Sequence, residues 1–301
     1  MAAPAAVAGA PEPSQPVIPT NVGISAPVHQ TGRPEIPTCV GMTHVPHYRL
    51  RMSPPTRPFW LSVFFDLPEA VFDSTVGFWS AVTGYSLSPL RGDHQEFGTL
   101  LPPAGDDYLR VQRVGDDVPR LHLDVHVPDP DAAATRAIEL GAAPLADPGL
   151  GYRVLRSPAG LTFCLVTHPS HTRPPAATWP DGNRSLIDQV ALDLPDDVHD
   201  VEAAFWAALL HEPVRSFGDS EFSAIERRPE LPVRVLLQRL DEPAGPARAH
   251  LDLATDDVAA EVARHRALGA EHVRDHDQWT VLRDPSGLDY CVTRGIRSFD
   301  G

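Results

Sequence analysis

Residues 121–127 read Leu-His-Leu-Asp-Val-His-Val, and residues 249–254 repeat the pattern as Ala-His-Leu-Asp-Leu-Ala. In both stretches apolar residues occupy every second position, which is typical of a strand with one buried face. The polar faces of the two stretches carry His122, Asp124, His126, His250 and Asp252. Two matched strands with the same polar face indicate a duplicated unit, and they mark where a ligand would lie.

The duplication extends far beyond these strands. Phe78-Trp79 recurs as Phe205-Trp206, and Cys164 recurs as Cys291, with offsets that stay within 126–128 residues. In each copy a strand precedes an amphipathic helix, and short alternating strands follow. The sequence therefore predicts an α+β fold made of two tandem βαβββ-repeat modules.

The boundaries of the modules follow from composition. Residues 1–55 hold 11 of the 33 prolines and show no helical or strand periodicity, so we expect a disordered extension. This stretch contains a short internal repeat, and we expect that Met52 begins the natural protein. The two modules should span residues 56–168 and 185–297, joined by a proline-rich linker at 169–184.

Composition excludes several classes of function. The net charge of −15 argues against nucleic acid or a membrane surface as partner, and no apolar run is long enough to span a membrane. The 25 basic residues are all arginine, which excludes a lysine Schiff base and a P-loop lysine. Three cysteines far apart in the chain do not form a disulfide framework, so we expect a reducing, cytoplasmic environment.

The repeated motifs resemble those of a known superfamily. They are the helix ending in Phe-Trp, the Val-Gln-Arg and Leu-Gln-Arg strands, the His-Leu-Asp strands, the helix ending in Leu-Gly-Ala, and the hairpin at 283–292. With these features the chain resembles the vicinal oxygen chelate superfamily, in its glyoxalase-like or bleomycin-resistance-like branch, over residues 57–168 and 185–296. The resemblance implies curved mixed sheets that surround a concavity, with helices on the outer faces.

The resemblance also implies where a metal would bind in those members that hold one. The ligand positions fall on Gln189, His250 and Cys291 in the second module. In the first module they fall on Ser62, His122 and Cys164. Neither set holds two histidines and a carboxylate, which Fe(II) or Mn(II) would prefer. We therefore expect no cofactor, and the Gln189 set remains as an alternative site for a softer divalent ion such as zinc.

Several residues are candidates for the lining of the concavity. The histidine and aspartate of each strand also suit a structural hydrogen-bonded pair, and the two module cysteines also suit a packed core. The candidates are His122, Asp124, His126, Gln189, His250, Asp252, Trp60, Phe64, Cys164 and Cys291. Trp279 is a further candidate for an aromatic wall, whereas Trp79 and Trp206 lie on helical stripes that are typical of a core.

These features lead to one functional prediction and two alternatives. The leading prediction is a metal-independent protein that binds a small apolar or aromatic molecule in its concavity. The first alternative is an enzyme of the superfamily, a lyase, isomerase or dioxygenase, that uses His250 or His122. The second is a non-catalytic interaction module whose concavity is filled by its own side chains. We expect a monomer in which the two modules pair within one chain, or a homodimer.

Overall fold

The computed structural model describes residues 55–218 and 220–295. The expectations for the N-terminal extension, including the start at Met52, lie outside the described residues.

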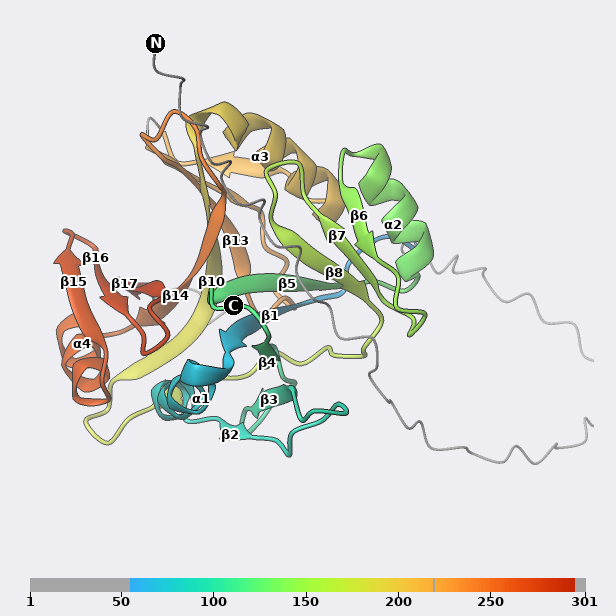
Figure 1. Cartoon of the computed structure of the whole chain (residues 1–301). Coiled ribbons are helices and arrows are strands. Elements are labelled where there is room, and N and C mark those ends of the chain that lie inside the picture. Colours follow the sequence, from blue (N-terminus) through green and yellow to red (C-terminus); the bar gives the residue numbers. More distant parts are fainter. Residues whose placement is uncertain (1–54, 219, 296–301) are drawn as a thin grey trace, which may run out of the picture.

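The first module forms one eight-stranded mixed sheet (Figure 1). Its elements are β1 (Trp60–Pro68), α1 (Glu69–Thr83), β2 (Ser86–Leu87), β3 (Phe97–Leu101), β4 (Leu109–Val114), β5 (Arg120–His126), α2 (Pro130–Glu139), β6 (Ala143–Ala146), β7 (Arg153–Arg156) and β8 (Thr162–Val166). The strand order is β2-β3-β4-β1-β5-β8-β7-β6. The central pair β1 and β5 is antiparallel, and each of these two strands has a parallel outer neighbour, β4 and β8 respectively.

The second module repeats this sheet. Its elements are β9 (Ala177–Thr178), β10 (Arg184–Leu194), α3 (Asp196–Leu210), β11 (Val214–Ser216), β12 (Phe222–Ile225), β13 (Arg234–Arg239), β14 (Arg248–Thr255), α4 (Val258–Ala267), β15 (Glu271–Asp275), β16 (Trp279–Arg283) and β17 (Asp289–Arg294). The order β11-β12-β13-β10-β14-β17-β16-β15 matches that of the first module, and β9 adds to β10. The predicted α+β fold of two tandem βαβββ-repeat modules with curved mixed sheets is therefore confirmed.

The helices begin and end where local chemistry dictates. Asp129 and Asp257 cap the N-termini of α2 and α4, where their carboxylates accept backbone N–H groups. Helix α1 ends at Gly84 in the left-handed conformation, with φ of 72°. At the equivalent end of α3 the left-handed residue is His211, with φ of 58°. The second copy therefore retains the helix stop without glycine, at some cost in backbone strain.

Helices of the two modules pack against each other in equivalent ways, so α1 lies beside α4 and α3 beside α2 (Figure 1). Arg264 of α4 donates to the carbonyl of Val82 at 2.8 Å, at the C-terminus of α1. Arg136 of α2 donates to the carbonyl of Ala208 at 3.1 Å, near the C-terminus of α3. Each guanidinium thus satisfies a carbonyl that the helix end leaves unpaired.

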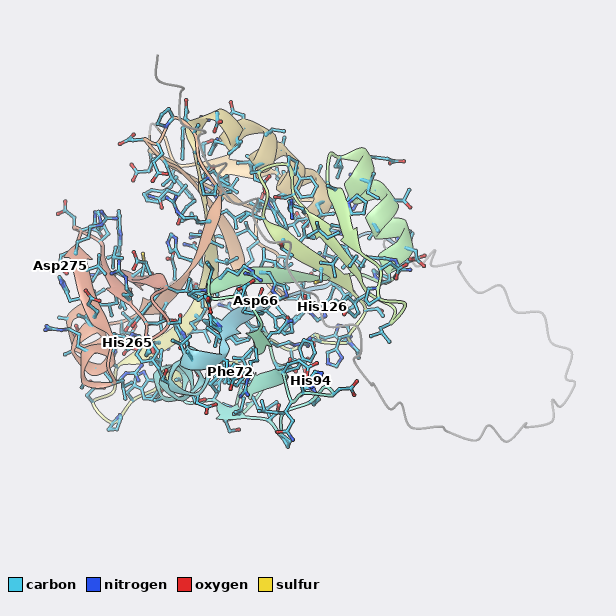
Figure 2. All side chains as sticks on the ribbon, in the orientation of Figure 1. Asp66, Phe72, His94, His126, His265 and Asp275 are labelled. Carbon is cyan, nitrogen blue, oxygen red and sulfur yellow. The ribbon has the colours of Figure 1, made fainter. Side chains whose placement is uncertain are left out.

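One hydrophobic core is continuous through both modules. Trp79 and Trp206 are each 1% exposed within it. The indole N–H of Trp79 donates across the modules to Asp284 at 2.8 Å. Figure 2 shows side chains filling the region between α1 and α4, where His265 is fully buried near Phe78. The core therefore occupies the helical faces of the sheets, and their opposite faces are left to form the concavities.

Candidate functional site

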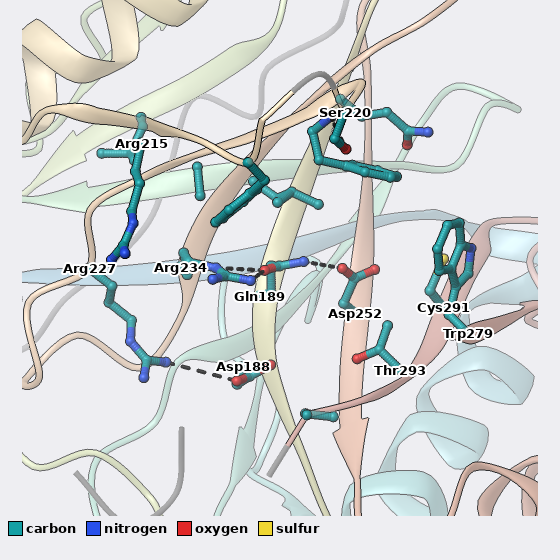
Figure 3. Close-up of a pocket in the computed structure, with 18 of the residues that line it drawn as sticks. Asp188, Gln189, Arg215, Ser220, Arg227, Arg234, Asp252, Trp279, Cys291 and Thr293 are labelled. Atoms are coloured by element: carbon teal, nitrogen blue, oxygen red, sulfur yellow. Dashed lines mark hydrogen bonds and ion pairs between the residues drawn. The ribbon is translucent and has the colours of Figure 1, made fainter. Parts of the chain in front are cut away.

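A cavity of about 750 Å³ opens on the concave face of the second module (Figure 3). Side chains from β10, β12, β13, β14, β16 and β17 line it. Its polar wall includes Gln189, His250, Asp252 and Cys291, and Trp279 lies among its aromatic residues. Four of the ten predicted lining residues, together with Trp279, therefore meet in one cavity.

The equivalent face of the first module is filled by its own side chains. The ring of Phe64 stacks on that of His122, with centroids 4.7 Å apart and an interplanar angle of 7°. The guanidinium of Arg110 lies 5.9 Å from the Phe64 centroid and 3.8 Å from Asp124.

The second module has small or apolar residues at both of these positions. Phe64 pairs with His122 on one side and Arg110 on the other, and Ala191 pairs in the same way with His250 and Leu236. Ala191 and Leu236 belong to a small apolar cluster that is separate from the main core. These two differences give a physical reason for the cavity in the second module.

Cross-strand pairing identifies the residues that share the floor of the cavity. Gln189 pairs with Asp252, and Asp252 pairs with Cys291, across three adjacent strands. His250 lies two residues before Asp252 on the same face. One donor atom each from His250, Asp252 and Cys291 lies within 4.8 Å of the others. The structure thus places Asp252, a carboxylate that the predicted set of Gln189, His250 and Cys291 did not include, beside His250 and Cys291. The predicted set itself stays a prediction.

Gln189 serves to orient Asp252. Its side-chain amide donates to Asp252 Oδ2, and its Oε1 accepts from Arg234 Nε at 2.7 Å. The other carboxylate oxygen, Asp252 Oδ1, accepts no hydrogen bond from the described residues, although His250 Nε2 lies 3.3 Å away. A buried carboxylate oxygen is thus left directed at the cluster, where it can serve as a ligand.

A second carboxylate holds His250 through the ring nitrogen that faces away from the cluster. Nδ1 of His250 donates to Asp193 Oδ2 at 2.9 Å, and the first module repeats this with Asp66 Oδ1 2.9 Å from Nδ1 of His122. Burial lowers the pKa of His250, but the neighbouring carboxylates of Asp193 and Asp252 outweigh it, so the pKa is raised well above its usual value. Burial raises the pKa of the Cys291 thiol. At neutral pH the cluster therefore holds an imidazolium and a neutral thiol.

The donor chemistry of this cluster fits a divalent ion. A carboxylate behind Nδ1 orients the imidazole so that Nε2 faces the ligand side, which is the usual arrangement at metal-binding histidines. Binding would require His250 and Cys291 to release their protons. A set of one nitrogen, one oxygen and one sulfur donor suits zinc better than Fe(II) or Mn(II). A divalent metal is thus plausible here, which differs from the expectation of no cofactor.

The remaining candidates lie elsewhere. His122, Asp124, Cys164 and Phe64 gather on the covered face of the first module. Trp60 is fully buried in the core, and its indole N–H donates to the carbonyl of Asp107 at 3.1 Å.

His126 is also fully buried, between the hydroxyl of Ser62 at 2.8 Å and the carbonyl of His168 at 2.7 Å. Burial lowers its pKa to about 4, so it is a neutral structural hydrogen-bonding residue. The hydroxyl of Ser62 is engaged by His126, although Ser62 lies opposite Asp124 in the sheet.

The sequence reasoning missed two groups of residues. The first group is the arginines and phenylalanines contributed by residues 213–234: Arg215, Phe217, Phe222, Arg227 and Arg234. No motif marks them, because their convergence depends on how β11 to β13 fold over the sheet. The second group is Asp66 and Asp193, whose offset of 127 residues places them within the repeat register and was an available signal.

Among the described residues, no helix is long and apolar enough to cross a membrane.

Comparisons with known proteins agree with this architecture. A family model for the glyoxalase-like domain matches residues 62–166 and 189–293. A comparison with curated protein sequences gave no match.

Among solved structures, a mutant of 4-hydroxymandelate synthase from Streptomyces coelicolor is 17% identical, with a TM-score of 0.53 over 81% of this chain and 94% of that one. A Mn(II)-bound glyoxalase from Novosphingobium aromaticivorans is 18% identical, with a TM-score of 0.53 over 79% and 82%. The 2,2',3-trihydroxybiphenyl 1,2-dioxygenase from Sphingomonas wittichii is 15% identical, with a TM-score of 0.50 over 79% and 90%. These likenesses show a shared fold, and the two family matches show that the chain belongs to the glyoxalase-like domain family of the vicinal oxygen chelate superfamily, as a tandem pair of modules.

Proposed function

We propose that the second module is the catalytic module of a metal-dependent enzyme and that it acts on a small aromatic molecule bound in its cavity. The observation that carries the proposal is the presence of the His250, Asp252 and Cys291 donors on the wall of a cavity of about 750 Å³. A cavity of that size is typical of small-molecule sites. In the first module the same donor types lie beneath Phe64 and Arg110.

The structurally similar proteins support the chemistry proposed here. One of them is a Mn(II)-bound glyoxalase and another is a trihydroxybiphenyl dioxygenase. The fold thus houses both a divalent metal and a reaction on an aromatic ring in other proteins. For this chain the sulfur donor of Cys291 favours a non-redox ion such as zinc, and so a lyase or isomerase. A dioxygenase is the alternative reaction class.

The side chains around the cluster have distinct roles in this proposal. A bound ion would act as a Lewis acid on an oxygen of the ligand. Asp193 holds Nδ1 of His250, so Nε2 faces the cluster. Gln189 holds one oxygen of Asp252 and leaves the other directed at the cluster, and Arg234 fixes the Gln189 amide. Aromatic and aliphatic groups of β12, β13 and β16 exclude water from the ligand ring.

Metal content measured on the purified full chain tests the proposal. We expect one ion per chain and, after exchange with Co(II), a near-ultraviolet charge-transfer band from the Cys291 thiolate. Cys291→Ser should abolish the band. Cys164→Ser is the matched control, because Cys164 occupies the equivalent position in the first module, and it should leave the band intact. Absence of a bound ion, or loss of the band only in Cys164→Ser, would contradict the proposal.

One observation favours the metal-independent binder as a second candidate. His250 is already paired with both Asp193 and Asp252, and Gln189 also donates to Asp252. These groups therefore satisfy much of one another's charge and hydrogen-bonding capacity without an ion. A chelator decides between the candidates: an aromatic probe that binds equally well before and after chelation, to a protein with no bound metal, favours the binder.

A further inference from the structure

We propose that the ligand of this cavity is an aromatic oxyanion, whose anionic group binds against Arg215 and Arg227 while its ring packs against Trp279. The inference rests on the proposed function, because it names the class of molecule that the same cavity takes.

One side of the cavity carries an excess of positive charge. Figure 3 shows Arg215, Arg227 and Arg234 on the same side, with Gln189 and Asp252 between them and Trp279. Arg234 donates to the neutral amide oxygen of Gln189. Arg227 lies 4.0 Å from one carboxylate oxygen of Asp188, a long ion pair. Arg215 has no hydrogen bond or ion pair with any of the described residues.

The lining carboxylates do not fully balance the lining arginines. Arg294 is a fourth arginine of the cavity, whereas Asp188, Asp252 and Glu226 are its three carboxylates, so positive charge exceeds negative charge by one. Asp252 is engaged by His250 and Gln189. Glu226 lines the cavity but is exposed, and within the described chain it forms no ion pair with the arginines. Burial is the main cause that lowers the pKa of Arg227; the charges of Arg173 and Arg234 lower it further, and Asp188 opposes them. A bound anion would relieve this repulsion.

Guanidinium groups select oxyanions by geometry as well as charge. The planar fork of an arginine matches a carboxylate or sulfonate with two parallel hydrogen bonds. The chain as a whole has a net charge of −15, so a cationic wall inside one cavity stands out against its surface. Such a wall discriminates between an acid and its neutral analogue more strongly than apolar contact does.

The opposite wall provides a fixed aromatic surface. Trp279 is half-buried, and the Phe222 ring meets it edge-on, with centroids 5.7 Å apart and an angle of 89°. His276 stacks on the indole at 4.4 Å and 15°. Contacts from two sides hold the indole in place, so a ligand ring meets a preformed surface. The ligand then spans the cavity from this surface to the arginines.

A matched pair of fluorescent probes tests the inference on the full chain. 8-Anilinonaphthalene-1-sulfonate and N-phenyl-1-naphthylamine share their ring system and differ by the sulfonate. We expect the sulfonate to bind at least about tenfold more tightly, because charge-assisted hydrogen bonds to guanidinium are the stronger kind. In the double variant Arg215→Gln/Arg227→Gln this preference should fall about tenfold, while affinity for the neutral probe changes less than about twofold.

Two further variants keep the test decisive. Arg215→Gln alone changes an exposed side chain, so it folds even where the double variant does not, and it should weaken the sulfonate about threefold. Arg283→Gln is the control, because Arg283 pairs with Asp289 outside the cavity, and it should change neither affinity.

The outcomes separate the inference from the proposed function. The inference is overturned if the two probes bind with equal affinity. It is also overturned if the double variant loses affinity equally for both probes. Ala191→Phe places a ring where Phe64 lies in the first module, and it should block both probes. If Ala191→Phe blocks both probes but the wild-type protein binds the sulfonate no more tightly than the neutral probe, the cavity remains the ligand site. In that case only the inference about charge fails. If both probes bind Ala191→Phe as well as wild type, they bind elsewhere, and both ideas fail.

Discussion

The Ala191→Phe substitution tests the difference between the two modules most directly. Ala191 lies between His250 and Leu236 in the sheet, just as Phe64 lies between His122 and Arg110. A phenylalanine at 191 therefore has a packing arrangement already present in the same chain. It should stack on His250 and occupy the part of the cavity that lies over the cluster.

The expected effect on binding follows from area. If the new ring removes about 100 Å² of apolar contact from a bound aromatic ligand, the loss is about 2.5 kcal/mol, or roughly 50- to 100-fold in Kd. The expected effect on stability is small. Overpacking a filled core costs about 1–3 kcal/mol. We expect the lower end, because Ala191 is buried between Leu236 and His250, which both line the cavity, so the new ring can extend into it.

The assay combines fluorescence titration of 8-anilinonaphthalene-1-sulfonate with thermal unfolding of the same samples. Ala191→Phe should lose binding and keep its Tm within about 4 °C of wild type. The converse variant, Phe64→Ala, should keep binding and lower the free energy of unfolding by about 2 kcal/mol, because it removes a half-buried stacked ring. A folded Ala191→Phe protein with undiminished affinity would refute the assignment of the ligand to this cavity.

Three further predictions concern the other buried polar groups. Asp193→Asn should weaken metal binding about 10- to 100-fold, measured by competition with a chelating dye, whereas the matched Asp66→Asn should not. Arg264→Ala should lower the free energy of unfolding in urea by about 3 kcal/mol, because it leaves the buried Glu261 carboxylate without its guanidinium partner. For comparison, Arg136→Ala loses only a hydrogen bond to a backbone carbonyl, so it should lower the free energy of unfolding by about 1 kcal/mol. In the folded protein His126 has a pKa of about 4, whereas in the unfolded chain it has its ordinary pKa of 6.5. Between these two pH values the unfolded chain therefore binds a proton that the folded protein does not. Stability should therefore fall by up to about 3 kcal/mol as the pH drops from 6.5 to 4, and His126→Gln should flatten that part of the profile.

Much of the fold could be predicted because local signals repeat. The alternation at 121–127 and 249–254 determines which residues face the core, and the constant offset between the copies determines that there are two modules. The caps at Asp129 and Gly84 sit where sequence rules place them. These features depend on short-range geometry, so they can be predicted from sequence.

The candidate ligand cluster shows the limit of prediction from sequence. His250 and Asp252 lie two apart on one strand face, so alternation alone cannot say which of them meets Cys291. Cross-strand register decides it, and register depends on the partner strands β10 and β17. The arginine wall shows the same limit on a larger scale, because Arg215 and Arg234 converge only after β11, β12 and β13 have paired.

Charge gives a reason for the two copies of the cluster to differ in function. In the first module the carboxylates of Asp66 and Asp124 flank the imidazolium of His122, and Arg110 adds a second positive charge 3.8 Å from Asp124. The formal charges of these four side chains sum to zero. In the second module Leu236 replaces Arg110, so the equivalent groups carry one net negative charge. Within the cluster itself a divalent cation is therefore less favoured in the first module than in the second, whose cavity arginines lie on the other side of Gln189. The exchange of arginine for leucine also leaves more room above the second cluster.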